Sequence, residues 1–175
     1  WKKIEDTALP ISNIKVSHGT IERGPASAIL QFNNADIEES PMAQMLEDRF
    51  LRLCLSQEIK KNALIDLIEH RKINEISNLN KKKQLTLDNS SKLQASLIVA
   101  SDGINSPTAK AFGIRKAGWK YKQRGLVCAV DHEYPSDNTA YQYFLPEGPL
   151  AILPIKNNTA SIVWTESIQN ASTMS

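Results

Sequence analysis

The chain has 175 residues, a length that fits one domain with at most part of a second. Hydrophobic residues make up 41% of it and charged residues 23%, a globular composition that excludes a wholly disordered chain. The formal net charge of +2 gives no electrostatic basis for binding nucleic acid, so we expect no such partner.

The sequence lacks the motifs of several kinds of site. Cys54 and Cys128 form no CxxC pair and fit a reducing compartment, and the three histidines are not at metal-ligand spacing, so we expect no metal. The apolar runs are far shorter than the roughly 20 residues of a membrane span, and no signal peptide opens the chain, which predicts a cytoplasmic protein. Neither GxGxxG nor GxxxxGK[ST] occurs, so the usual phosphate-binding loops are absent.

The first part of the chain predicts two strands and one helix. Alternating apolar residues predict a strand over 11–18, and a second apolar run predicts a strand over 26–32. Ser40-Pro41 combines a hydroxyl N-cap with a first-turn proline, which is typical of a helix start. Apolar residues at three- and four-residue steps then predict a helix over 41–59.

The middle of the chain predicts a short antiparallel meander and then a capped helix. Apolar patterns predict strands over 63–68, 72–79, 81–88 and 93–100. Ser106-Pro107 repeats the N-cap and proline pattern, so we expect a short helix over 107–112 that ends at Gly113.

The remaining residues predict a sheet and a polar tail. Strands are predicted over 125–130, 139–145, 150–155 and 159–165, with a hairpin turn at Asn157-Asn158 because asparagine tolerates positive φ. Residues 167–175 are polar and are predicted to form a flexible tail. The fold class is therefore α+β, with a mixed and mostly antiparallel sheet and few helices.

A first candidate site follows the predicted strand over 93–100. The carboxylate of Asp102, the flexible Gly103 and a helix capped at Ser106 would place three useful groups together. A carboxylate accepts hydrogen bonds from a sugar hydroxyl, glycine lets the backbone approach a ligand, and free N–H groups at a helix start attract phosphate. Taken alone, the same residues also fit an ordinary Asp-Gly turn and helix cap.

A second candidate site is an apolar strand between prolines. Gly148-Pro149 and Pro154 bracket a stiff apolar strand, which can form the wall of a pocket for a flat, hydrophobic ligand. Trp164 lies on a neighbouring predicted strand and can stack on an aromatic ring. These residues also fit a sheet edge that tolerates proline and a tryptophan of the core.

Several segments then occur in one order along the chain. They are 97–106, 112–114, 119–123, 126–127, 132–133, Gln142, Phe144, 148–154 and 163–165. The first resembles the Asp-Gly fingerprint of FAD-dependent aromatic hydroxylases, and the whole set is similar to the ubiquinone-biosynthesis hydroxylases of that family. The resemblance covers 95–165 strongly and the remainder loosely.

The resemblance implies the central, substrate-side portion of the para-hydroxybenzoate-hydroxylase type of FAD fold. Residues 1–117 would be the remainder of the FAD-binding domain with early substrate-domain strands, 118–166 the antiparallel sheet of the substrate domain, and 167–175 the tail. Family members are more than twice as long and carry GxGxxG and Gly-Asp motifs that are absent here. Since the chain also starts with Trp1 rather than Met, we expect it to be the middle piece of a longer enzyme.

The resemblance also implies an activity. An FAD-dependent monooxygenase of this type hydroxylates a polyprenyl-phenol ring, with electrons from NAD(P)H and oxygen from O2. The implied cofactor-binding residues are Asp102, Gly103 and Ser106, and the implied substrate contacts are Gln142, Pro149, Leu150 and Trp164. No catalytic residue is assigned.

The implied partners are the polyprenyl-phenol substrate, other ubiquinone-biosynthesis proteins and the surface of the inner membrane, at which a cytoplasmic enzyme would act peripherally. Two alternatives stay open. The chain can be a non-catalytic fragment or interaction module that cannot hold FAD alone, or it can belong to another flavoprotein of the same fold, such as a halogenase or a geranylgeranyl reductase.

Overall fold

The structure is a computed structural model that describes residues 1–37, 41–79, 82–135 and 137–174. It contains two compact units. One comprises Trp1–Lys61 and Lys120–Ser175, and the other comprises Asn62–Trp119. The domain boundary expected between 117 and 118 stays a prediction.

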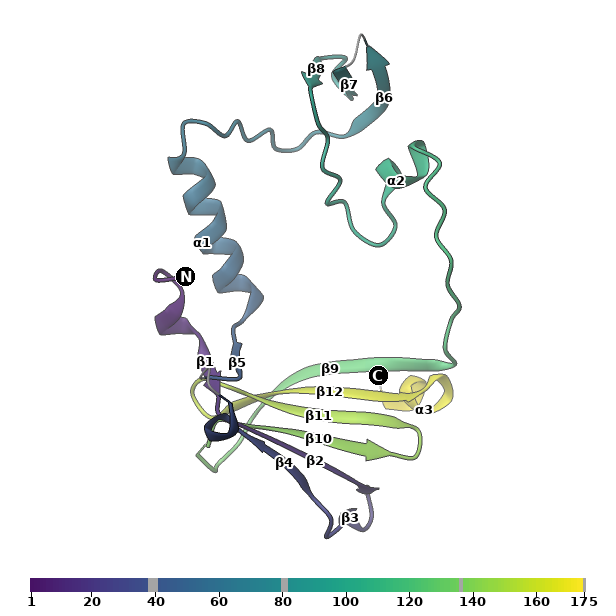
Figure 1. The fold of residues 1–175 in the computed structure, drawn as a ribbon. Coiled ribbons are helices and arrows are strands. Elements are labelled where there is room, and N and C mark those ends of the chain that lie inside the picture. Colours follow the sequence, from purple (N-terminus) through teal and green to yellow (C-terminus); the bar gives the residue numbers. More distant parts are fainter. Residues whose placement is uncertain (38–40, 80–81, 136, 175) are drawn as a thin grey trace. The chain divides into compact units, whose positions relative to one another are not determined.

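The first unit is built on a sheet of seven strands. These are β2 (Asn13–Thr20), β3 (Gly24–Pro25), β4 (Leu30–Asn33), β9 (Gln123–Asp131), β10 (Thr139–Leu145), β11 (Gly148–Ile155) and β12 (Thr159–Ser167). Strands β9, β12, β11, β10 and β2 lie side by side in this order, and β3 and β4 both pair with β2 (Figure 1). All pairings are antiparallel except that of β10 with β2, which is parallel.

The four strands predicted in the C-terminal half are confirmed, and so is the hairpin turn. Asn157 and Asn158 have φ values of 64° and 56° in the three-residue loop between Ile155 and Thr159, and asparagine tolerates this left-handed conformation. Residues expected to form a flexible tail instead form α3 (Ile168–Met174). Its first turn is capped by the Ser167 hydroxyl, which accepts a hydrogen bond from the Asn170 N–H at 3.2 Å, and Ala171 is buried. Because this short helix packs on β9 and β12, contacts distant in sequence order a segment that looks polar in isolation.

The N-terminal part of this unit corrects one helix prediction. After the 3-10 turn η1 (Glu5–Thr7), β1 (Leu9–Ile11) pairs with β5 (Ala43–Met45), so the residues after Pro41 are not helical. A second 3-10 turn, η2 (Asn34–Asp36), follows β4, and the predicted helix exists only as α1 (Asp48–Lys61). The expected N-cap, Ser40, lies outside the described residues. Pairing with β1 satisfies backbone groups that the periodic pattern had assigned to a helix.

Helix α1 carries its own start and stop signals. Asp48 lies in its first turn and bonds to Arg52 at 2.6 Å, while Lys60 and Lys61 occupy its last turn. These charges complement the helix dipole at both ends. The sequence therefore contains a signal for the true start of the helix at Asp48, seven residues after Pro41.

The second unit contains the predicted meander. Strands β6 (Ile73–Leu79), β7 (Lys82–Leu87) and β8 (Lys92–Ala95) pair in sequence order, and α2 (Pro107–Ala111) follows with Ser106 as its N-cap. The strand predicted over 63–68 is wrong, as is the extension of β8 to residue 100. Leu97 and Val99 are 75% and 77% exposed, and no strand of the described ranges pairs with them. Without a neighbouring strand to accept and donate backbone hydrogen bonds, this apolar run does not form a strand.

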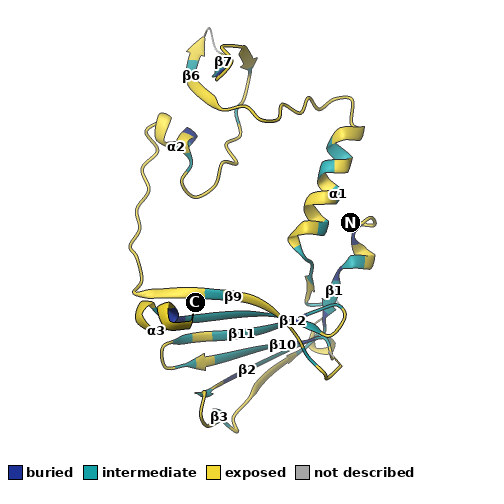
Figure 2. Ribbon diagram, turned by 180° about the vertical axis from the view of Figure 1, so that it is seen from behind, coloured by how far each residue is buried: buried dark blue, intermediate teal, exposed yellow. Residues whose placement is uncertain are grey.

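The core of the described residues is small. Its buried hydrophobic side chains are Ile4, Ala8, Ile11, Leu87, Ala140, Ala160 and Ala171. Figure 2 shows that β10, β11 and β12 are mostly half-buried and that β9 is largely exposed. None of the helices in the described ranges is long and apolar enough to cross a bilayer. The seven-stranded sheet thus presents apolar side chains that the described residues leave partly uncovered.

Candidate functional site

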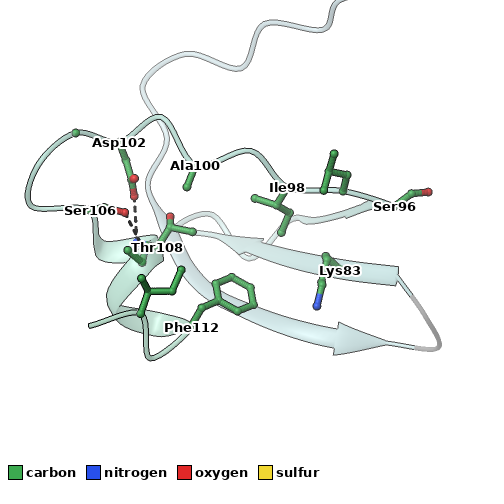
Figure 3. Close-up of a pocket in the computed structure, with 12 residues that line it drawn as sticks. Lys83, Ser96, Ile98, Ala100, Asp102, Ser106, Thr108 and Phe112 are labelled. Carbon is green, nitrogen blue, oxygen red and sulfur yellow. Dashed lines mark hydrogen bonds between the residues drawn. The ribbon is translucent and has the colours of Figure 1, made fainter. Parts of the chain in front are cut away.

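The segment from Asp102 to Ser106 is folded back onto the start of α2 (Figure 3). The Thr108 N–H donates a hydrogen bond to Asp102 Oδ2 at 3.0 Å, and the Ala109 N–H donates to Ser106 Oγ at 2.9 Å. The Ser106 N–H closes the turn by donating to the Gly103 carbonyl at 3.1 Å. Both predicted polar side chains therefore cap the same helix.

These hydrogen bonds determine the charge of Asp102. The Ser106 side chain, and then the side chain and backbone N–H of Thr108, lower the pKa of the Asp102 carboxyl to about 2. Hydrogen bonds to the charged form of a carboxyl favour ionisation, so Asp102 is an anion throughout the neutral range. It can accept hydrogen bonds from a ligand but cannot donate one.

This arrangement corrects one expectation about phosphate. The first N–H groups of α2 were expected to be free, but those of Thr108 and Ala109 have side-chain acceptors, and that of Lys110 donates to the Ser106 carbonyl at 3.3 Å. A phosphate placed there would displace these bonds and meet the negative charge of Asp102. The chemistry of Asp102 fits a hydroxyl donor, such as a sugar or ribityl hydroxyl, better than an anion.

A cavity of about 520 Å³ lies beside this turn. Its lining residues are Lys83, Ser96, Leu97, Ile98, Ala100, Asp102, Gly103, Ser106, Thr108, Ala109, Phe112 and Ile114. Gly103 has a φ of +82°, and a side chain built on it would meet no atom within 4 Å, so the backbone is open to a ligand. The Lys83 ammonium lies 5.5 Å from the centre of the Phe112 ring and adds one cation to the wall. An open glycine, a hydroxyl acceptor and a mainly apolar wall fit part of a dinucleotide such as FAD.

The four predicted substrate contacts fall on two faces of the seven-stranded sheet. Directly paired residues share a face, and the pairs are Gln142 with Ala151, Phe144 with Pro149, Tyr143 with Leu150, and Leu150 with Trp164. We name the two faces after their central residues on β10. The Gln142 face contains Ala140, Gln142, Phe144, Pro149, Ala151, Leu153, Ser161 and Val163, and the Tyr141 face contains Thr139, Tyr141, Tyr143, Leu150, Ile152, Pro154, Ala160, Ile162 and Trp164.

The structure therefore brings the predicted residues together only in pairs. Gln142 and Pro149 lie on one face, and Leu150 and Trp164 lie on the other, so all four cannot line one space on one side of the sheet. Trp164 is half-buried, and its indole Nε1 is buried without a hydrogen-bond partner.

Lys83, Tyr141 and Tyr143 are among the cavity-lining residues that sequence reasoning missed. Lys83 belongs to a run of lysines that is typical of a solvated hairpin end, and no local signal distinguishes it. Tyr141 and Tyr143 line a second cavity with stacked rings 6.4 Å apart, and their alternation with Gln142 was visible in the sequence. Alternation thus showed that the two tyrosines lie on the face opposite to Gln142, but it did not show which of the two faces lines a cavity.

Comparisons with known proteins agree on one class. The chain shares its fold with the crystal structure of PqsL, a probable FAD-dependent monooxygenase from Pseudomonas aeruginosa, with a TM-score of 0.81 over 95% of this chain and 45% of that one, at 16% identity. It is 40% identical over 88 residues to the mitochondrial ubiquinone biosynthesis monooxygenase COQ6 of Rattus norvegicus, which covers 50% of this chain and 18% of COQ6. It is 29% identical over 166 residues to the ubiquinone hydroxylase UbiL of Rhodospirillum rubrum, which covers 95% of this chain and 37% of UbiL. No protein-family model matches the chain.

The fold is thus that of part of an FAD-dependent monooxygenase, and the α+β class predicted from the sequence is confirmed. In sequence, the chain is similar to parts of the ubiquinone biosynthesis monooxygenase COQ6 and the ubiquinone hydroxylase UbiL. It spans less than half the length of the relatives described above.

Proposed function

We propose that this chain serves as the middle segment of an FAD-dependent monooxygenase that hydroxylates a polyprenyl-phenol in ubiquinone biosynthesis. The overall reaction consumes the phenol, O2, NAD(P)H and one proton, and it yields the hydroxylated phenol, water and NAD(P)+. The observation that carries the proposal is the sequence similarity to COQ6 over half of this chain and to UbiL over 95% of it.

The cofactor side of the proposal rests on the turn of the second unit. We propose that Asp102 accepts a hydrogen bond from a hydroxyl of FAD, and that Gly103 offers open backbone beside it. Ser106 keeps this turn in place by capping α2, so its contribution to the cofactor is positional. FAD supplies the redox chemistry when bound, and these residues supply binding and orientation.

The substrate side of the proposal is the Gln142 face. The Gln142 amide lies among apolar neighbours and can hydrogen-bond a phenol hydroxyl in either sense. Phe144 is 56% exposed and Val127 70% exposed on the same face, and a hollow of about 440 Å³ beside Phe144 includes Val16 and Leu30 in its lining. Such a surface suits an apolar prenyl chain, and it also suits the peripheral membrane contact and the protein partners that the resemblance implies.

Leu150 and Trp164 lie on the opposite face, so a variant at Gln142 tests the choice of face. The enzyme that contains this chain is expressed in a strain without its own ubiquinone hydroxylase, and hydroxylated intermediates are measured by mass spectrometry. Wild type should restore product, and Gln142→Leu should reduce it without loss of bound FAD. Absence of product with the wild-type enzyme contradicts the proposed function, while normal product from Gln142→Leu contradicts only the choice of face.

A second pair of variants tests the cofactor turn. Asp102→Ala removes both the charge and the acceptor, whereas Asp102→Asn keeps an oxygen that can accept from the Thr108 N–H. We expect Asp102→Ala to lower the amount of bound FAD or its rate of reduction by NAD(P)H, and Asp102→Asn to do so less. Unchanged flavin content and reduction rate in Asp102→Ala would leave this residue as a helix cap alone.

A further inference from the structure

A second cavity lies on the Tyr141 face, away from the face proposed for the substrate. It has a volume of about 480 Å³ and lies between β10, β11 and β12 and the residues around His132. Its apolar wall is formed by Tyr141, Tyr143, Ile152, Pro154 and Ile162 among others. This volume falls within the range of small-molecule sites.

Aromatic rings form part of this wall. The rings of Tyr141 and Tyr143 are stacked with an angle of 13° between their planes, and the Lys15 ammonium lies 5.7 Å from the centre of the Tyr141 ring. Burial raises the pKa of the Tyr143 hydroxyl, so this phenol stays protonated at neutral pH. Stacked rings offer a flat ligand a surface for offset or edge-to-face contact.

One buried polar group in this wall has no protein partner. Thr139 is 3% exposed and lines the cavity, and its Oγ1 has no hydrogen bond, although its N–H donates to Asp137 Oδ1 at 3.2 Å. A buried hydroxyl without a partner is costly, and native structures rarely keep one without a reason. A ligand that carries one hydrogen-bonding group would supply what Thr139 lacks.

The charges around the cavity narrow the class of ligand. The Asp137 carboxylate lines it and the Lys15 ammonium lies against the Tyr141 ring, so these charges favour neither an anion nor a cation. Most of the wall is apolar, so a buried charge of either sign would lose its solvation. The other polar side chains of the lining are neutral or weakly basic: the phenols of Tyr134, Tyr141 and Tyr143 and the imidazole of His132.

We propose that this cavity on the Tyr141 face binds a neutral, flat ring compound that carries one hydroxyl or carbonyl group, with Thr139 Oγ1 as its hydrogen-bond partner. The site is separate from the proposed substrate contacts, because Gln142 and Pro149 lie on the other side of the same sheet. It therefore goes beyond the proposed hydroxylation and does not depend on it.

The test uses the whole 175-residue chain labelled with 15N, and benzyl alcohol and toluene as probes of the same ring with and without a hydroxyl. We expect saturable shifts of the Thr139, Tyr141 and Ala160 N–H signals, with benzyl alcohol binding about fivefold more tightly than toluene. In Thr139→Val this difference should disappear, while toluene binding stays the same. Thr165→Val is the matched control, since it removes a hydroxyl from the opposite face and should change neither affinity.

Three outcomes would overturn the proposal. The first is no saturable shift at these signals with either probe, which would mean that the cavity holds water only. The second is shifts confined to the Gln142 face. The third is a Thr139→Val chain that binds benzyl alcohol as tightly as wild type. The signals of the variant's remaining residues report directly that it is folded, so a loss of binding cannot be mistaken for unfolding.

Discussion

Replacing Thr139 by valine should stabilise the protein, although most substitutions of buried residues destabilise. Valine keeps the β-branched shape of threonine, and it fits the pleated strand β10 as well as threonine does. The change replaces a hydroxyl that has no hydrogen bond by a methyl group of similar size. No hydrogen bond of the hydroxyl is lost, because it makes none with the described residues.

The magnitude follows from the cost of a buried, unpaired hydroxyl. That cost is about 1–3 kcal/mol on the scale of protein mutations, so Thr139→Val should raise the free energy of unfolding by about this amount. Thr7→Val is the matched control in the same unit, because the Thr7 hydroxyl donates to the Ile4 carbonyl at 2.7 Å. Its loss should lower stability by about 0.5–1.5 kcal/mol, so the two identical substitutions should have opposite signs.

The measurement is urea unfolding followed by the backbone NMR signals of β10, β11 and β12, which report on the first unit alone. For a chain of this size, each kcal/mol corresponds to a shift of the melting temperature of about 2–4 °C, so calorimetry offers a second readout. If Thr139→Val destabilises the protein as much as Thr7→Val does, the Thr139 hydroxyl has a partner in solution. The reasoning about this cavity wall would then be wrong.

Three further predictions address the cofactor and the two faces. The purified 175-residue chain should be colourless, because one carboxylate and one open glycine supply only part of the binding energy of a dinucleotide; a stoichiometric flavin spectrum would contradict this. The pKa of Asp102 in the folded chain is about 2, below its unfolded value, so its stabilisation of the turn is present above about pH 4 and is lost as the pH falls toward 2. The measurement is an acid titration of the Thr108 and Ala109 N–H signals, and a midpoint near pH 4 would contradict this prediction. Leu150→Asp should lower the stability of the sheet more than Pro149→Asp, because Leu150 is half-buried beside Trp164 whereas Pro149 is exposed. Equal losses of stability in thermal unfolding would argue against the assignment of faces.

Local signals predicted the elements that depend on local chemistry. The turn at Asn157-Asn158 and the Ser106 cap of α2 need only the residues themselves, and both were predicted correctly. The helix over 41–59 was predicted too long because its first residues pair with β1, which is more than thirty residues away along the chain. The apolar run at Leu97 and Val99 was predicted as a strand, but strand formation depends on a neighbour, and periodicity carries no information about one.

The candidate sites show the same division. Asp102, Gly103 and Ser106 were placed together correctly because they are close in sequence, yet the occupation of the α2 N–H groups by their side chains was not foreseen. Alternation correctly separated Leu150 from Ala151, but only the pairing of β10 with β11 shows that Gln142 shares a face with Ala151. Register is a property of two strands, so a single strand cannot reveal which of its residues meet those of another.

The two faces of the seven-stranded sheet differ in a way that composition does not show. Both are largely apolar, but the two buried side-chain groups without hydrogen bonds among the described residues, Thr139 Oγ1 and Trp164 Nε1, both lie on the Tyr141 face. Each costs about 1–3 kcal/mol, and together they are a large share of the 5–15 kcal/mol by which proteins are stable. A partner bound to the Tyr141 face would offset this free-energy cost by supplying the missing hydrogen bonds. The Gln142 face has an exposed apolar surface with one amide in it, which suits a substrate that must bind and dissociate. The Tyr141 face has buried polar atoms without hydrogen bonds, which suit a ligand whose polar group matches their positions.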